Sequence, residues 1–101
     1  MVAFTDRAVV PRHVLVRQLD GESVLLNLDT EKYFGLDTTG TRMWEVATSS
    51  ANIEAAYLKL VDEFEVEPSV LREHLSELLG QLLENGLLQL LPSDVGTIRA
   101  L

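Results

Sequence analysis

The spacing of hydrophobic residues changes near residue 37, and this change constrains the fold more than any other feature of the sequence. Before that point, apolar and polar residues alternate loosely in short runs, which is typical of strands with one buried face. After it, apolar residues recur at intervals of three and four, which is typical of amphipathic helices. We therefore expect a small sheet followed by a set of helices.

Three short strands are expected near residues 12–18, 23–28 and 32–36. Asp20-Gly21 separates the first two, and both residues tolerate the positive φ of a tight hairpin turn. Asp29-Thr30-Glu31 forms a polar turn before the third, so the strands are expected to make an antiparallel meander. Because side chains alternate along a strand, the residues expected to share faces are Val24, Leu26 and Leu28 in the second strand, Phe34 and Leu36 on one face of the third, and Tyr33 and Gly35 on its other face.

Three helices are expected near residues 39–48, 50–64 and 68–85. The residues expected to begin or end them are Thr38 or Thr39 for the first, Ser49 or Ser50 for the second, and Pro68 with Asn85-Gly86 for the third. Trp44, Leu60, Phe64 and Leu82 are expected to be largely buried. Residues 87–91 are expected as a short final strand that Pro92 ends, and residues 92–101 as a loose tail.

The chain of 101 residues, 47% of them hydrophobic, is expected to form one domain with its core at about residues 12–91. The expected fold class is α+β, a winged-helix-type domain in which a three-stranded antiparallel meander is followed by three helices. One face of the sheet takes the helices and the other is left partly open. No apolar run approaches the roughly 20 residues of a membrane span, and no signal peptide is recognisable, so the cytoplasm is the expected compartment.

The composition argues against most catalytic and metal sites. The absence of cysteine excludes disulfides, thiolate nucleophiles and cysteine zinc sites, and His13 and His74 lie far apart in the sequence. Glu73-His74 lacks the HExxH spacing, residues 62–67 lack the spacing of a calcium loop, and the glycines at 35 and 40 lack the Lys-Ser/Thr of a phosphate loop. We therefore expect no cofactor, no metal and no catalysis. A small enzyme remains an alternative that would require a pocket with paired, pKa-shifted carboxylates.

The net charge of −8, from 16 acidic and 8 basic residues, repels phosphate backbones and anionic lipids. Nucleic acids and membranes are therefore not expected as partners. A winged-helix DNA-binding regulator is the main alternative, because the layout permits it. The charge opposes it, since the third expected helix carries Glu73, Glu77 and Glu84 against Arg72.

The third strand and the third helix together predict a peptide-binding surface. The strand is the last of the meander, so its outer edge is expected to be unpaired, and Gly35 lets another backbone approach. The helix carries more leucine than one core-facing stripe requires. An open edge beside an apolar helix is what strand addition by a peptide needs. The same edge could pair with a second copy of the chain, so a homodimer is also considered.

Several motifs, taken in order, resemble the coenzyme PQQ synthesis protein D (PqqD) family. They are Val24-Leu25-Leu26, the run YFGLDTTG from Tyr33 to Gly40, Met43-Trp44, and further along Leu75, Leu78, Leu79, Leu82 and Gly86-Leu87-Leu88. The resemblance covers about residues 12–91. The chain departs from the family pattern at Asp37, His74 and Leu78.

The resemblance implies a RiPP recognition element, a small non-catalytic domain that acts in natural-product biosynthesis. Such a domain binds the leader region of a ribosomally synthesised precursor peptide and presents it to a modifying enzyme. That enzyme would be a radical SAM protein, as in PQQ biosynthesis, or a leader peptidase, as in lasso-peptide systems. In the family, the leader adds as a strand to the third strand and packs against the third helix.

The residues expected to bind the leader are Glu31, Lys32, Tyr33, Phe34, Gly35, Leu36 and Asp37 of the strand region and Leu71, His74, Leu75 and Leu78 of the helix. The strand would supply main-chain hydrogen bonds, and apolar leader side chains would settle against the helix. His74 is expected to tune one polar contact, which would make binding depend on pH near ~6–7. The acidic helix would favour a leader that carries some lysine or arginine.

Overall fold

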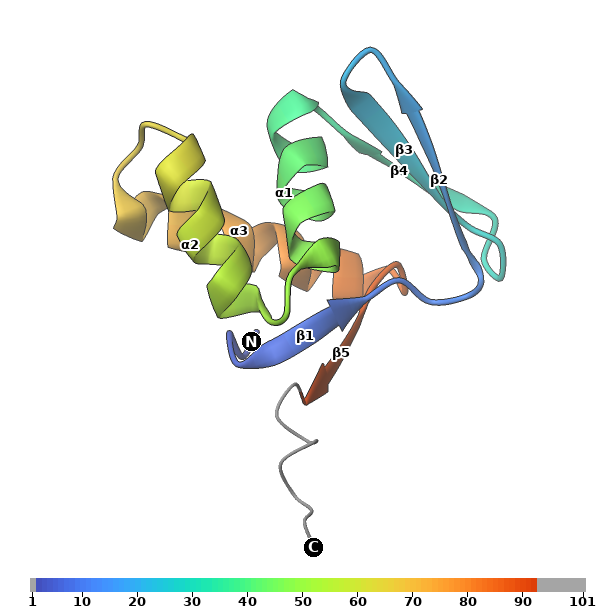
Figure 1. The fold of residues 1–101 in the computed structure, drawn as a ribbon. Coiled ribbons are helices and arrows are strands. Elements are labelled where there is room, and N and C mark those ends of the chain that lie inside the picture. Colours follow the sequence, from blue (N-terminus) through green and yellow to red (C-terminus); the bar gives the residue numbers. More distant parts are fainter. Residues whose placement is uncertain (1, 93–101) are drawn as a thin grey trace, which may run out of the picture.

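The computed structural model describes residues 2–92 and contains three helices and five strands (Figure 1). In chain order these are β1 (Asp6–Val9), β2 (Val14–Leu19), β3 (Glu22–Asn27), β4 (Lys32–Leu36), α1 (Thr38–Ser49), α2 (Ile53–Glu63), α3 (Pro68–Glu84) and β5 (Gln89–Pro92). The three central strands and the three helices follow the expected order. The α+β fold of winged-helix type is therefore confirmed.

The three central strands form an antiparallel sheet in the order β2-β3-β4, which confirms the predicted meander. Asp20 (φ 55°) and Gly21 (φ 83°) supply the two positive φ angles of a tight β2–β3 hairpin. The β3–β4 turn is held by the side chain of Asn27, whose Oδ1 accepts hydrogen bonds from the N–H groups of Asp29 (2.9 Å) and Thr30 (3.2 Å). Both turns are local, so the register of the meander is set within a few residues.

The helices cover one face of the meander, and the other face is open to solvent (Figure 1). Phe34 and Leu36 share one face, as predicted, and this face points toward the core. Val24, Leu26 and Leu28 share a face, but this face points outward, and the buried side chains of β3 are Ser23, Leu25 and Asn27. The outward face carries exposed apolar side chains at Leu15, Leu19, Val24, Leu28 and Tyr33.

The predicted cap of the first helix was wrong by one or two residues. Asp37, rather than Thr38 or Thr39, caps α1, and its Oδ1 accepts a hydrogen bond from the N–H of Gly40 at 2.8 Å. A carboxylate is favoured here because it accepts the free N–H groups of the first turn and also meets the positive end of the helix dipole. The cap therefore lies directly after β4 and fixes where the strand ends.

The predicted cap of the second helix was also wrong. Asn52, rather than Ser49 or Ser50, caps α2 and accepts a hydrogen bond from the N–H of Ala55 at 2.8 Å. The two serine hydroxyls instead donate to carbonyl groups in the last turn of α1, at 2.7 Å for Ser49 and 2.6 Å for Ser50. Serine can bond back to the preceding turn in this way, and as a result α2 begins three residues later than expected.

The hydrophobic core lies between the three helices and the inner face of the meander. Trp44, Leu60 and Leu82 are buried as predicted, whereas Phe64 is partly buried and packs against the core. Pro68 lies in the first turn of α3, and Gly86 (φ 69°) follows its end, as the sequence predicts. Within residues 2–92, no helix combines the length and apolar character that a membrane crossing requires.

A second, two-stranded sheet joins the two ends of the described chain. β1 pairs antiparallel with β5 in a register that runs from Asp6↔Pro92 to Val9↔Gln89. The final strand was predicted from the sequence but β1 was not, and Pro92 is the last residue of β5, whereas it was expected to end the strand beforehand. Val2 and Ala8 are buried in the core, so the N-terminal residues are part of the fold. Apart from Pro92, the tail expected at residues 92–101 lies outside the described residues.

Candidate functional site

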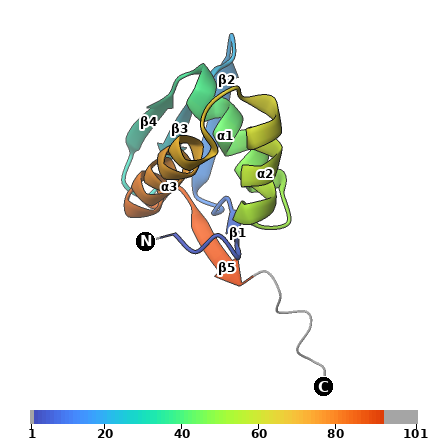
Figure 2. The ribbon, with the colours of Figure 1, turned by 90° about the vertical axis from the view of Figure 1, so that its left-hand side faces the viewer.

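β4 has one edge that no strand within residues 2–92 pairs with. β3 occupies the other edge, in a register that runs from Ser23↔Leu36 to Asn27↔Lys32. Figure 2 shows β4 at the border of the meander, on the side away from β2. The open edge that the sequence predicted is therefore present, with a row of backbone groups that another strand could bond.

The backbone groups on this edge belong to Tyr33 and Gly35. The N–H of Leu28 donates to the carbonyl of His13 at 2.8 Å, which sets the alternation of bonded pairs in the β2–β3 ladder. Alternation then turns the backbone groups of residues 22, 24 and 26 toward β2 and those of residues 23, 25 and 27 toward β4. Residues 23, 25 and 27 pair with residues 36, 34 and 32 of β4. Residues 33 and 35 therefore direct their N–H and C=O groups away from β3, to the open edge.

The predicted strand residues differ in how much of each is accessible. Glu31, Lys32 and Gly35 are exposed, and Tyr33 has 73% of its surface exposed. The remaining three point inward or have a structural role: Phe34 is partly buried, Leu36 is buried, and Asp37 is exposed but caps α1. The accessible part of the segment is thus its backbone edge together with the outward side chains.

The four predicted helix residues also fall into two groups. Leu71 and Leu75 lie in the core with 1% and 0% of their surface exposed, so a peptide on the surface would meet little of either side chain. His74 is exposed, and Leu78 is partly buried and packs against the core. The structure therefore brings two of the four to the surface, and peptide contact by any of them stays a prediction.

His74 and Leu78 lie on one flank of α3, in line with the point where the end of the helix contacts the meander. With 3.6 residues per turn, spacings of four and seven place His74, Leu78 and Asn85 along one flank. The carbonyl of Asn85 accepts a hydrogen bond from Nδ2 of Asn27 in β3 at 2.9 Å. Beside it, Nε2 of His13 lies 2.9 Å from the carbonyl oxygen of Gly86. These contacts hold the end of α3 against the meander.

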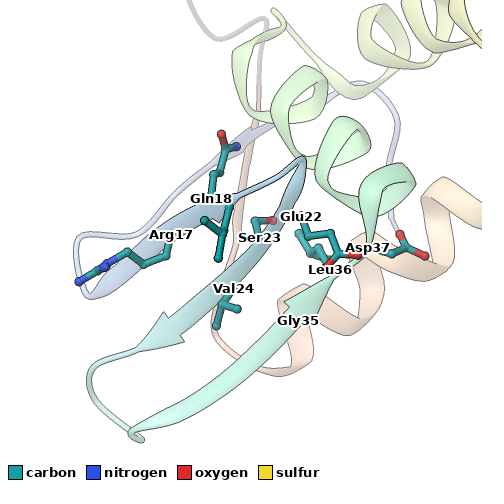
Figure 3. Close-up of a pocket in the computed structure, with 9 residues that line it drawn as sticks. Arg17, Gln18, Glu22, Ser23, Val24, Gly35, Leu36 and Asp37 are labelled. Atoms are coloured by element: carbon teal, nitrogen blue, oxygen red, sulfur yellow. The ribbon is translucent and has the colours of Figure 1, made fainter.

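A hollow of about 570 Å³ lies at the end of the meander where β4 meets α1 (Figure 3). Its lining residues are Arg17, Gln18, Leu19, Glu22, Ser23, Val24, Gly35, Leu36 and Asp37. Gly35 leaves room in it, because a Cβ atom added at this glycine would meet nothing within 4 Å. This hollow was not predicted from the sequence, although a glycine within a strand, here Gly35, was a signal for it.

The basic residue of α3 is engaged within the protein. An Nη2 atom of Arg72 lies 3.3 Å from Oε1 of Glu54, and its guanidinium stacks over the rings of Phe4 (4.0 Å to the centroid) and Tyr57 (5.0 Å). The exposed residues of α3 include Glu73, Glu77 and Glu84. The helix thus offers an acidic surface, which is unsuited to a DNA groove.

The shifted titratable groups lie in an ion pair between α1 and α2. Arg42 donates to both carboxylate oxygens of Glu63, at 2.6 and 2.9 Å, and to Glu45 at 3.3 Å. These hydrogen bonds lower the pKa of Glu63 and raise the pKa of Arg42. All three side chains are partly exposed and have partners, so the pair has the character of a structural link between helices.

Comparison with solved structures gives two similar chains. One is described as "TbiB1 in Complex with the TbiA(beta) Leader Peptide", with 29% identity and a TM-score of 0.72 over 80% of this chain and 94% of that chain. The other is described as "Lasso peptide synthetase B1 complexed with the leader peptide", with 24% identity and a TM-score of 0.71 over 82% and 98%. The second likeness establishes the fold alone. No protein with a curated description matches the chain significantly.

The model of the family described as Coenzyme PQQ synthesis protein D (PqqD) matches residues 22–88 of this chain. The matched segment begins in β3 and runs through β4 and all three helices, to the residue before β5. It contains the open edge of β4 and the flank of α3 described above. Because the match covers well over half of the sequence, this chain belongs to the PqqD family.

Proposed function

We propose that this protein is a non-catalytic adaptor that binds the leader region of a ribosomally synthesised precursor peptide and presents it to a modifying enzyme. The observation that carries the proposal is the open edge of β4, where Tyr33 and Gly35 direct their N–H and C=O groups outward. Membership of the PqqD family supports it, as does the similarity to TbiB1, which was solved with a leader peptide. The leader would add to β4 as an antiparallel strand.

Main-chain hydrogen bonds would supply only part of the affinity. Tyr33 and Gly35 each offer one donor and one acceptor, so the edge accommodates about four hydrogen bonds. Each contributes about 0.5–1.5 kcal/mol net, and the ordering of a flexible peptide offsets much of this gain. Side-chain contacts must therefore supply the rest of the affinity and all of the selectivity.

Leader side chains would alternate between the two sides of the added strand. Those that point inward would meet Phe34 of β4 and the flank of α3 that carries His74 and Leu78. Leu71 and Leu75 would support that flank from the core. The exposed Glu73 and Glu77 would attract lysine or arginine in the leader, and this contribution would weaken at high salt.

The adaptor would act by holding the precursor close to a second protein. Once the leader is anchored at β4, the attached core peptide has a high effective concentration at an enzyme that also binds the adaptor. A radical SAM enzyme or a leader peptidase would fill this role. A homodimer through the same edge would compete with the leader for Tyr33 and Gly35, so adding leader should dissociate any such dimer in analytical ultracentrifugation.

The DNA-binding alternative gains no support from the structure. A recognition helix needs free basic side chains, and Arg72 of α3 is held by Glu54, Phe4 and Tyr57. The charge of −8 opposes the same role.

An isotope-edited NMR titration tests the proposal. The ¹⁵N-labelled protein is titrated with synthetic leader peptides of precursors encoded beside its gene, and with a scrambled peptide of the same composition as the control. The proposal predicts amide shifts that cluster in residues 31–37 and 70–79 for a leader and none for the scrambled peptide. Shifts confined to β2 or to β1 and β5 would contradict it, because these elements lie away from the open edge.

A further inference from the structure

We propose that the hollow beside Gly35 is a specificity pocket that receives one large apolar or aromatic side chain of the bound peptide. The inference rests on the proposed function, because the side chain would come from a strand added to β4. It goes further by naming the position of that residue and the chemistry of its side chain.

The register of β4 decides where the side chain would lie. Gly35 directs its backbone groups to the open edge, so one residue of an antiparallel added strand pairs with it directly. Side chains of directly paired residues lie on the same face of a sheet. Gly35 pairs on its other side with Val24, which is 41% exposed on the outward face. The residue opposite Gly35 would therefore also point to the outward face, beside the hollow.

The pocket has room and apolar walls. A Cβ at Gly35 would meet nothing within 4 Å, and the hollow measures about 570 Å³. Leu19 and Val24 are among its lining residues, and both are exposed when no peptide is present. The charged residues of the lining are Arg17 and Glu22, which have opposite signs, and Asp37, whose carboxylate accepts the capping hydrogen bond of α1. Figure 3 shows Val24 on β3, the strand next to Gly35. These walls favour a large apolar ring or chain over a charged group.

The neighbouring outward position differs in the space it offers. The residue two positions along the added strand would pair with Tyr33, whose side chain is large and 73% exposed. Tyr33 does not line the hollow, so a bulky residue there would pack beside the tyrosine ring instead of entering the hollow. The two outward positions are therefore unequal, and the one opposite Gly35 is where a large side chain gains most.

Filling the pocket tests this inference without removing the backbone edge. Gly35→Leu places a side chain in the hollow, and Gly35→Ala fills it in part. Gly80→Leu is the matched control, because Gly80 also has nothing within 4 Å of an added Cβ and belongs to α3 instead of β4. A phage-displayed random-peptide library is selected against the wild type and each variant. Thermal unfolding and the amide spectrum establish that every variant is folded.

The wild type and Gly80→Leu should select peptides with a large apolar residue at one fixed position, and Gly35→Leu should select a small residue there. With a peptide selected on the wild type, alanine at that position should weaken binding about tenfold in calorimetry, as expected for the loss of a large buried side chain. On Gly35→Leu the same alanine change should cost no more than about twofold, with Gly35→Ala in between.

Two negative results have different meanings. If peptides bind with amide shifts along β4 but Gly35→Leu selects the same residues as the wild type, the pocket inference is wrong and the proposed function stands. If no selected peptide shifts the amides of β4, the proposed function fails and the inference fails with it.

Discussion

Asn27 joins the β3–β4 turn to the end of α3, and replacing it with alanine should destabilise the protein. Only 4% of the surface of Asn27 is exposed. Nδ2 donates to the carbonyl of Asn85 at 2.9 Å, and Oδ1 accepts from the N–H groups of Asp29 (2.9 Å) and Thr30 (3.2 Å). Asn27→Ala removes all three bonds, and with them one of the two contacts that hold the end of α3 against the meander.

The magnitude follows from how well water can replace these bonds. Three bonds at about 0.5–1.5 kcal/mol each give a range of about 1.5–4.5 kcal/mol. Asp29, Thr30 and Asn85 are all exposed, so water can satisfy part of what the alanine leaves unpaired. We therefore expect a loss of about 2 kcal/mol in the free energy of unfolding, a large fraction of the 5–15 kcal/mol typical of a domain.

Urea denaturation, followed by the fluorescence of Trp44, measures this loss, because Trp44 is the sole tryptophan and is 4% exposed in the folded state. The control is Asn85→Ala, which removes one exposed side-chain bond, from Nδ2 to the carbonyl of Gln81, and keeps the Asn85 carbonyl. It should change the free energy by no more than about 0.5 kcal/mol. If Asn27→Ala costs no more than this control, the reasoning is refuted.

Three further predictions concern backbone strain, an ion pair and charge. Gly86→Ala should lower the free energy of unfolding by about 1–2 kcal/mol, because Gly86 has φ 69° and an added Cβ would lie 2.9 Å from Nδ2 of Asn27. Equal stability of the variant and the wild type in urea denaturation would contradict this prediction. Glu63→Gln should reduce stability at pH 7, and the difference from the wild type should narrow as the pH is lowered past 4.5. Because the pKa of Glu63 is lowered in the folded protein, its ion pair stabilises the fold above the pKa of the unfolded state and loses this effect when Glu63 is protonated. A difference between variant and wild type that stays constant across pH in thermal unfolding would refute this prediction. The protein should not shift duplex DNA in a gel at physiological salt, and sub-micromolar binding would reopen the regulator alternative.

The elements that the sequence predicted well are those set by local chemistry. Asp20-Gly21 specifies a tight hairpin through two positive φ angles, and Pro68 and Gly86 begin and end α3. β1 was missed because its four residues, DRAV, carry no strand pattern of their own, and its partner β5 lies some eighty residues away. A pairing at that distance depends on tertiary packing, which no local pattern records.

The open edge of the candidate site was predicted, but its accessible α3 residues and its hollow were not, because these also depend on tertiary packing. Strand order follows from the turns, so the open edge of β4 could be anticipated. Which leucines of α3 reach the surface depends on how α2 and the N-terminal residues pack, and the sequence analysis therefore could not separate Leu71 and Leu75 from Leu78. The hollow beside Gly35 depends on which face of the sheet the helices cover, and alternation alone left that open.

Amide hydrogen exchange at single residues of β4 tests strand addition most directly. Tyr33 and Gly35 direct their N–H groups to the open edge, whereas Phe34 between them bonds to β3. With a saturating leader peptide, we predict that exchange at Tyr33 and Gly35 slows at least about tenfold, while exchange at Phe34 changes much less. Binding of the leader with unchanged exchange at Tyr33 and Gly35 would contradict the account, because a strand added to this edge must bond those two groups.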